Sequence, residues 1–139
     1  MEKNILLVDD DERLRNLISL FLQEKGYKIS TCKDLDEAED LINYFIFDLI
    51  VLDRMLPGGD GADLVKKIKS KLNTPILLLT ALGEPQDRIL GLKTGAEDYL
   101  SKPFEPEELF LRIKSILNRY DLNGLNSKLV SFGKYKFDL

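Results

Sequence analysis

Acidic side chains follow directly after two of the most apolar stretches of the chain. Asp9 and Asp10 come after the run at 5–8, and Asp53 comes after the run at 49–52. A carboxylate is a competent nucleophile toward phosphorus and forms an acyl phosphate. Carboxylate oxygens are also the ligands that hard divalent cations prefer. Together these properties indicate phosphoryl transfer to an aspartate, assisted by a divalent ion.

Two more residues with suitable chemistry lie at the ends of later apolar runs. Thr80 directly follows the run at 76–79, and Lys102 follows the short apolar pair Tyr99-Leu100 after one intervening residue. The hydroxyl of Thr80 can hydrogen-bond a phosphoryl oxygen, and the ammonium of Lys102 can neutralise charge on the transferring oxygens. We expect Thr80 to move toward the phosphoryl group after transfer, so that Tyr99 can rotate into the space that it leaves.

Several carboxylates in one pocket require cations. Two carboxylates about 4 Å apart repel by roughly 4 kcal/mol at an effective dielectric constant of about 20. Lys102 supplies one positive charge, and a divalent ion would supply two. The 139 residues contain no histidine and one cysteine, Cys32. A metal site must therefore use oxygen ligands, which points to Mg²⁺ or Ca²⁺, and oxygen-only ligands suit Mg²⁺. Structural zinc sites and Ser-His or Cys-His catalysis are excluded within these residues.

The bulk composition is that of a globular protein. Apolar residues make up 44% of the chain and charged residues 32%. A net charge of −4 and a pI of about 4.9 argue against nucleic-acid binding by these residues as a whole. The sequence has no apolar run long enough for a transmembrane helix and does not begin like a signal peptide. We therefore expect a cytoplasmic protein without a membrane partner.

Apolar runs alternate with segments of helical periodicity, which predicts an α/β fold of five strand–helix units. Unbroken Val/Ile/Leu runs are typical of strands buried on both faces of a parallel sheet. Right-handed crossovers then place helices on both sides. Ligands bind at the carboxyl ends of the strands in such a sheet, so the candidate residues should meet at one edge. The expected strands lie at 4–8, 27–32, 49–52, 76–79 and 99–100, and the expected helices carry their apolar residues at 14–22, 35–42, 64–72, 89–92 and 107–119.

Some neighbouring residues have a plain structural interpretation. A single aspartate after a strand is more often a helix N-cap than a metal ligand, and we assign that role to Asp11. Asp34 and Glu37 have the spacing of a capping box. Pro103 follows Lys102 directly, which favours a cis peptide bond that holds the lysine inward.

These motifs, in this order, resemble the receiver domain of two-component response regulators from about Asn4 to Tyr120. ILLVDDD resembles the acidic strand of that family, and IVLDRMLPGGDG resembles its phosphoacceptor strand and loop. LLLTA resembles the strand with the switch threonine, and GAEDYLSKPF resembles the strand with the aromatic switch and the Lys-Pro pair. The resemblance implies a flavodoxin-like doubly wound sheet with strand order 2-1-3-4-5 and five helices.

The same resemblance implies a role for each candidate residue. Asp53 would be the phosphoacceptor, and a sensor histidine kinase would donate the phosphoryl group. The protein would not be an enzyme that acts on outside substrates, but would assist its own phosphorylation and dephosphorylation. The implied Mg²⁺ ligands are Asp9, Asp10, Asp53 and the backbone carbonyl of Met55, the implied switch pair is Thr80 and Tyr99, and the cation that contacts the phosphoryl group is Lys102.

The stretch from residue 87 to residue 120 resembles one branch of the family, the winged-helix transcription factors of the OmpR/PhoB type. That resemblance implies homodimers on phosphorylation, which pair the fourth helix, fifth strand and fifth helix about a two-fold axis. Charges across such an isologous interface must pair reciprocally. The implied pairs are Arg88 with Glu108, Asp98 with Arg112, and Glu97 with Arg119, where Glu97 replaces the usual aspartate.

The end of the sequence changes in character after Tyr120. Residues 121–127, DLNGLNS, are short and polar and are interpreted as a linker. Residues 128–139 resemble the first strand of the DNA-binding effector domain of that branch, whose DNA-reading helix is absent. We therefore predict a receiver domain at 1–120, a linker at 121–127 and an effector stub at 128–139, with DNA bound only through the absent part.

A haloacid-dehalogenase-like phosphatase is a competing interpretation, because that class also uses a strand-end aspartate and Mg²⁺. Its motif needs a second aspartate two residues after the nucleophile, and Thr or Val two residues further on. Met55 stands at the first of these positions after Asp53. Asp9 does have Asp11 at the right spacing, but Arg13 then occupies the position of Thr or Val.

Two alternatives within the receiver interpretation also remain. A stand-alone phosphorelay receiver without a DNA-binding domain would share the same site but would end near Tyr120. A receiver that dimerises constitutively would signal without phosphorylation, although the complete acidic pocket argues against this alternative.

Overall fold

The computed structural model describes residues 2–81 and 95–135. Its main sheet has five strands in the order β2-β1-β3-β6-β7, and every neighbouring pair is parallel. This confirms the predicted α/β fold, because the five strands, numbered as they follow along the chain, lie across the sheet in the order 2-1-3-4-5. The strands are β1 (Asn4–Val8), β2 (Lys28–Cys32), β3 (Leu49–Asp53), β6 (Ile76–Thr80) and β7 (Asp98–Ser101).

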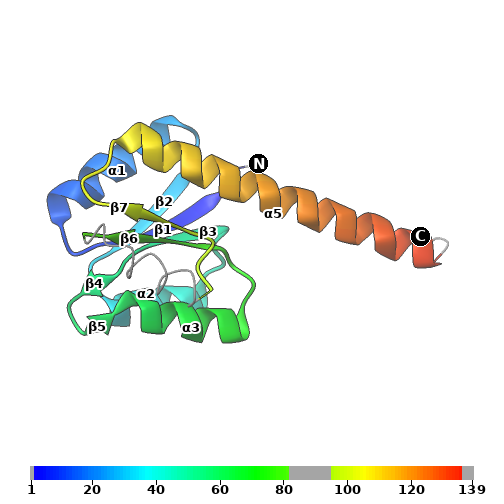
Figure 1. Ribbon diagram of the computed structural model, residues 1–139, viewed down its shortest axis with the longest axis horizontal. Coiled ribbons are helices and arrows are strands. Elements are labelled where there is room, and N and C mark those ends of the chain that lie inside the picture. Colours follow the sequence, from blue (N-terminus) through cyan, green and yellow to red (C-terminus); the bar gives the residue numbers. More distant parts are fainter. Residues whose placement is uncertain (1, 82–94, 136–139) are drawn as a thin grey trace.

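Helices cover both faces of the sheet. Figure 1 shows α1 (Glu12–Glu24) and α5 (Pro106–Tyr135) on one side, and α2 (Leu35–Tyr44) and α3 (Gly61–Lys71) on the other. A short antiparallel hairpin, β4 (Met55–Leu56) and β5 (Gly59–Asp60), follows β3. The predicted fourth helix, around residues 89–92, lies outside the described residues. No helix in the described part of the chain is long and apolar enough to cross a membrane.

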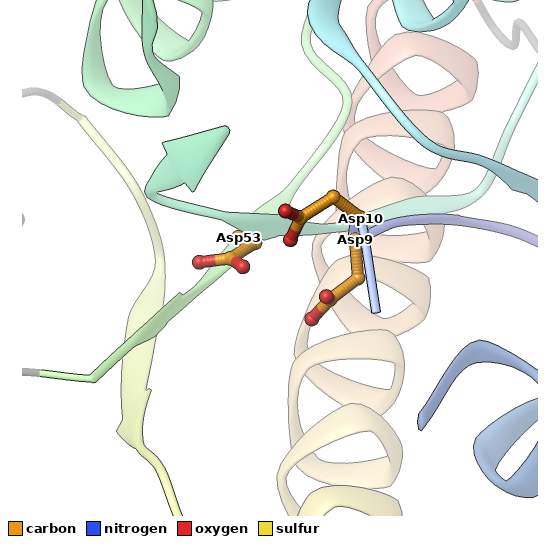
Figure 2. Close-up of side chains that lie close together, drawn as sticks. All are labelled: Asp9, Asp10 and Asp53. Atoms are coloured by element: carbon orange, nitrogen blue, oxygen red, sulfur yellow. The ribbon is translucent and has the colours of Figure 1, made fainter. Parts of the chain in front are cut away.

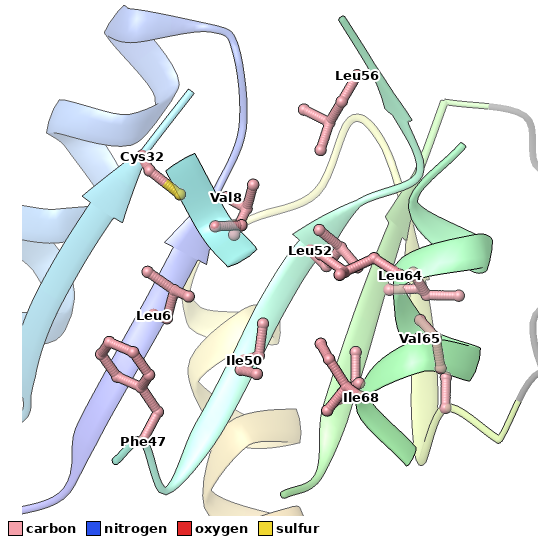
Figure 3. Close-up of a cluster of buried hydrophobic side chains, with 14 residues drawn as sticks. Leu6, Val8, Cys32, Phe47, Ile50, Leu52, Leu56, Leu64, Val65 and Ile68 are labelled. Atoms are coloured by element: carbon pink, nitrogen blue, oxygen red, sulfur yellow. The ribbon is translucent and has the colours of Figure 1, made fainter. Parts of the chain in front are cut away.

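The central strands β1, β3 and β6 are mostly apolar because successive side chains enter different cores. Leu6 and Ile50 pack toward α2 and α3 (Figure 3), whereas Ile5 and Leu7 pack toward α1 and α5. These strand side chains are 0–1% exposed. Burial of a Leu or Ile side chain contributes roughly 1.5–3 kcal/mol, so the two cores hold the sheet edge firmly in place.

The local signals at the helix starts are largely confirmed. The side chain of Asp11 accepts a hydrogen bond from the Leu14 N–H at 3.2 Å, which is the expected N-cap. Asp34 accepts from the Glu37 N–H at 2.8 Å, and the Glu37 carboxylate accepts in return from the Lys33 N–H at 3.1 Å. In the standard capping box the return bond comes from the N–H of the N-cap residue, whereas here it comes from Lys33, the residue before the N-cap. The N-cap hydrogen bond of Asp34 is present all the same. The Lys102-Pro103 peptide bond is cis, as predicted.

The structure differs from the prediction after Tyr120. We expected a linker at 121–127 and a strand from residue 128, but α5 continues as a helix to Tyr135. A strand needs a partner strand to satisfy its backbone groups, whereas a helix satisfies most of them internally. The segment 121–135 contains no proline that would end a helix. Its secondary structure was therefore predicted wrongly, while the assignment of residues 128–139 to an effector domain stays a prediction.

Gly61 fixes the path of the chain after Asp53. Its N–H donates to the Arg54 carbonyl at 2.6 Å, so the start of α3 lies against the end of β3. A Cβ at this position would lie 2.6 Å from the Asp53 carbonyl oxygen and 3.1 Å from the Arg54 Cα. Both obstacles are backbone atoms, which cannot move aside without shifting the strand that carries Asp53.

We expect Gly61→Ala to lower the free energy of unfolding by about 2 kcal/mol, because overpacking against a fixed backbone typically costs about 1–3 kcal/mol. Gly58→Ala is the matched control, since the φ of 95° at this position would strain an alanine but no atom lies within 4 Å of the added Cβ. It should cost about 1 kcal/mol. Urea unfolding measures the free energy of unfolding of both variants. Equal losses would show that the contact between the added Cβ and the β3 backbone does not destabilise the fold.

Candidate functional site

The predicted acidic residues meet at the carboxyl edge of the sheet. Asp9 and Asp10 follow β1 and Asp53 ends β3, and Figure 2 shows their carboxyl groups gathered at these strand ends. One carboxylate oxygen from each of the three lies within 4.8 Å of the others. Asp9 is 0% exposed and Asp53 is 5% exposed, whereas Asp10 is exposed. The cluster is thus closed on the protein side and open on one side to solvent.

Asp9 is held by the backbone through one carboxylate oxygen and contacts Lys102 through the other. Its Oδ1 accepts from the Asp11 N–H at 2.9 Å, and its backbone carbonyl accepts from Arg15 Nη1 at 2.7 Å. Its Oδ2 is fully buried and accepts no hydrogen bond. Lys102 Nζ lies 2.8 Å from this oxygen and forms an ion pair with it. A buried carboxylate oxygen that already contacts one cation can also serve as a ligand of a divalent ion.

Lys102 joins the two buried carboxylates. Its Nζ donates to Asp53 Oδ2 at 3.0 Å, in addition to its ion pair with Asp9. Its backbone N–H donates to the Thr80 carbonyl at 2.7 Å, so the β6 strand end helps to position it. Burial lowers the pKa of the Lys102 ammonium, but the contacts with Asp9 and Asp53 outweigh this effect and leave the pKa raised. The ammonium therefore stays charged.

Opposing influences act on the pKa of the Asp53 carboxylate. Burial raises the pKa of Asp53, the Lys102 ammonium lowers it, and the Asp9 charge raises it again. The Met55 N–H, which donates to Asp53 Oδ1 at 3.2 Å, lowers the pKa slightly, and the net shift is upward. The ionised form of Asp53 is thus held at a cost in free energy, and a further cation would reduce that cost.

The predicted switch residues lie on the two strands beyond Asp53. Thr80 ends β6 and is 4% exposed, and its Cα pairs with that of Ser101 on β7. Tyr99 pairs with Leu78, is half-buried, and packs against the core on the α2–α3 side. Thr80 and Tyr99 therefore occupy neighbouring strands two ladder positions apart. The predicted metal ligand Met55 begins the hairpin that follows β3, and its side chain is 59% exposed.

The residues predicted to pair between copies mostly find partners within the chain. Arg112 Nη1 lies 2.9 Å from Asp98 Oδ2, and Arg112 Nη2 lies 3.5 Å from Glu108 Oε2. Glu97 is occupied by Lys69, at 2.5 Å, and by the hydroxyl of Tyr120.

The remaining two residues of the predicted pairs are Arg119 and Arg88. Arg119 is exposed and forms no ion pair with a residue that the structure describes, and Arg88 lies outside the described residues.

Sequence reasoning missed an ion pair at the rim of the site. The Arg54 Nε lies 3.3 Å from Asp60 Oδ1, and the Arg54 side chain is only 12% exposed. The same Asp60 oxygen caps α3 by accepting from the Ala62 N–H at 2.9 Å. The available signal was the glycine-rich turn at 57–59, because a hairpin brings the residues on its two sides together.

The chain resembles known proteins over its whole described core. It is 47% identical to protein PetR of Rhodobacter capsulatus over 98% of this chain and 58% of PetR. It is 42% identical to the phosphate regulon transcriptional regulatory protein PhoB of Escherichia coli over 86% of this chain and 53% of PhoB. The chain thus spans only a little more than half the length of these relatives.

The fold has close counterparts among solved structures. The receiver domain of the Francisella response regulator 1452 matches with a TM-score of 0.82 and 38% identity, over 86% of this chain and 99% of that one. The family model of the response regulator receiver domain matches residues 5–114, which include the acidic cluster, Thr80 and Lys102. The chain therefore belongs to the response regulator receiver domain family.

Proposed function

We propose that this receiver is switched by phosphorylation of Asp53 and that a sensor histidine kinase donates the phosphoryl group. The observation that carries the proposal is the placement of the Asp53 carboxylate, which lies at the sheet edge 3.0 Å from the Lys102 ammonium and beside two further carboxylates. This combination supplies a nucleophile, a fixed cation and an anionic seat for a divalent ion. None of the three is explained by the packing of the fold.

The transfer itself asks little of the protein beyond positioning and charge. A carboxylate oxygen of Asp53 forms the bond to phosphorus, while the bond from phosphorus to the imidazole nitrogen of the donor breaks. The imidazole nitrogen keeps the electron pair of the bond that breaks. Lys102 neutralises negative charge on the transferred group, and the Thr80 hydroxyl donates to one of its oxygens. The product is the phosphorylated protein, so we propose a phosphoacceptor rather than an enzyme for outside substrates.

The residues present fit a divalent cation. The donor set is made of oxygen atoms, and the buried Oδ2 of Asp9 has no hydrogen bond. We assign Mg²⁺ to Asp9, Asp10 and Asp53, with the backbone carbonyl of Met55 as a further ligand, because hard cations take carboxylate and carbonyl oxygens. Bound there, Mg²⁺ would neutralise negative charge on the oxygens of the transferring group.

The conformational response is proposed for Thr80 and Tyr99. Thr80 moves toward the phosphorylated Asp53, and Tyr99 turns inward on the neighbouring strand. Both states pre-exist, and phosphorylation shifts the population between them. The shift changes the face formed by β7 and α5, which then pairs with a second copy of the chain. The name of PhoB describes a transcriptional regulator, and the similarity to PhoB supports the same output for the whole protein.

We expect Mg²⁺ to raise the stability of the unphosphorylated protein, because it binds the folded state and relieves repulsion between the carboxylates. At a concentration about 100 times its dissociation constant, the gain should be about 2.7 kcal/mol. Asp9→Asn should lose most of this gain, since it removes a buried ligand. Asp40→Asn is the matched control, because Asp40 is an exposed carboxylate on α2. Thermal melts with Mg²⁺ and with EDTA measure the effect, and an equal response in both variants would contradict the assignment.

The raised pKa of Asp53 gives a second prediction, for the metal-free protein. A carboxyl whose folded pKa is raised stabilises the fold below its unfolded pKa, near 3.9, and loses this contribution as pH rises through the folded pKa. Asp53→Asn avoids that loss, so in EDTA at pH 7 it should melt above wild type. The difference should shrink toward pH 4 and on addition of Mg²⁺. A variant that melts below wild type in EDTA would show that the ionised carboxylate is not held at a cost.

Phosphorylation is tested directly by intact-mass measurement after incubation with Mg²⁺ and acetyl phosphate. Wild type should gain the mass of one phosphoryl group, and Asp53→Ala should gain none. Asp40→Ala keeps the site complete and should behave as wild type. The proposal is wrong if wild type gains no mass, or if Asp53→Ala gains as much as wild type. Turnover of a generic phosphate ester by wild type would instead revive the phosphatase interpretation.

A further inference from the structure

The carboxylate of Glu97 is the centre of a cluster at the amino edge of the sheet, opposite the carboxyl edge that carries Asp53. Its Oε1 accepts from the Ile76 N–H at 2.7 Å. Its Oε2 lies 2.5 Å from Lys69 Nζ and also accepts from the Tyr120 hydroxyl. The Glu97 side chain is only 15% exposed. Both carboxylate oxygens are therefore engaged.

The cluster joins three elements that are far apart along the chain. Ile76 is the first residue of β6, Lys69 is near the end of α3, and Tyr120 is on α5. Lys69 Nζ also lies 3.5 Å from the Tyr120 hydroxyl and 5.9 Å from the centre of its ring. The backbone supports the same arrangement, because the Glu97 N–H donates to the Ile76 carbonyl at 2.9 Å.

The energetics favour these contacts over a pair between copies. Hydrogen bonds to a charged group are stronger than neutral ones, and a buried donor that loses its acceptor carries the full cost of its desolvation. A new pair between Glu97 and the exposed Arg119 of a second copy would be a surface ion pair, which typically contributes little. Such a pair would leave the Ile76 N–H and the Tyr120 hydroxyl without their acceptor.

We propose that Glu97 is a positioning residue that fastens α5 at Tyr120 to α3 and β6, and that it takes no part in pairing between two copies of the chain. Self-recognition through β7 and α5 then depends on Asp98, Glu108 and Arg112 and leaves Arg119 out. The part that concerns pairing rests on the proposed function, whereas the attachment of α5 within one chain does not.

A double-mutant cycle on the unphosphorylated chain tests the attachment. Tyr120→Phe should raise the unfolding equilibrium constant about tenfold in the wild-type background and less than about threefold in Glu97→Ala. Arg119→Ala is the matched control and should change it less than about twofold in either background. Equal effects of Tyr120→Phe in both backgrounds, or coupling of Arg119 to Glu97, would overturn the proposal. If Glu97→Ala does not fold, Lys69→Met replaces it, with the same decision between coupled and independent effects.

Ionisation of Tyr120 gives a readout that a general loss of stability would not move. Burial raises the pKa of Tyr120, and the hydrogen bond to Glu97 raises it further. The tyrosinate absorbance of each protein minus that of its Tyr120→Phe counterpart isolates this residue. Glu97→Gln removes the negative charge and should shift the Tyr120 midpoint to lower pH. Arg119→Ala should shift it in the opposite direction, because the Arg119 charge lowers the pKa of Tyr120. An unchanged midpoint in Glu97→Gln would count against the cluster.

Sedimentation of the protein phosphorylated at Asp53 tests the pairing. Arg112→Ala should weaken the dimer at least fivefold, and Arg119→Ala should stay within about twofold of wild type. Equal weakening by the two variants would overturn the proposal. If phosphorylated wild type stays monomeric, the dimerisation step of the proposed function is wrong, and the cycle and the titration alone decide the role of Glu97.

Discussion

Two buried carboxylates that share one ammonium group are the constraint on which the rest of the site depends. Asp9 and Asp53 both contact Lys102, and among the described residues no other cation pairs with both. The charges do not balance, because Asp10 adds a third carboxylate at the open side. The pocket therefore favours the binding of a further cation, and the proposed phosphoacceptor Asp53 lies beside it. The apolar cores on both faces of the sheet supply the free energy that holds this arrangement together.

The parallel sheet brings residues that are far apart in the sequence close together in space. Asp9, Asp53, Thr80 and Lys102 are up to 93 residues apart in the sequence, yet all lie at one edge because every strand of the sheet runs the same way. Close backbone contact then sets their positions more finely. Gly61 allows α3 to begin against the carbonyl of Asp53, and the Thr80 carbonyl accepts the backbone N–H of Lys102. The side chains of the proposed site are thus placed by backbone geometry as well as by side-chain packing.

The sequence was sufficient to predict the strands, their order and the members of the acidic cluster. The strands and the acidic cluster depend on local patterns, such as an apolar run or an acidic residue that ends one, whereas the strand order followed from the resemblance to receiver domains. It was not sufficient for contacts that join distant polar residues. The Arg54–Asp60 pair, the Glu97 cluster and the hydrogen bond from Arg15 to the Asp9 carbonyl carry no periodic signal. The helix at 121–135 was missed for a different reason. Resemblance suggested a strand, but a strand needs a partner sheet that these residues do not contain.

Glu97 and Asp98 show why neighbours in sequence need not share a role. Asp98 begins β7 and pairs with Arg112 on α5, whereas Glu97 precedes the strand and reaches Lys69 on α3. Successive residues of an extended chain point to opposite faces, so only one of the two can contribute to a given surface. The Glu97 carboxylate is also saturated by donors of its own chain, whereas Arg112 is half-buried and shared between two acids. A shared arginine can exchange one partner for the same acid on a second copy, because two-fold symmetry returns an arginine to the acid that is released. A saturated glutamate cannot, and this difference separates a residue that can recognise a partner from one that shapes the surface a partner meets.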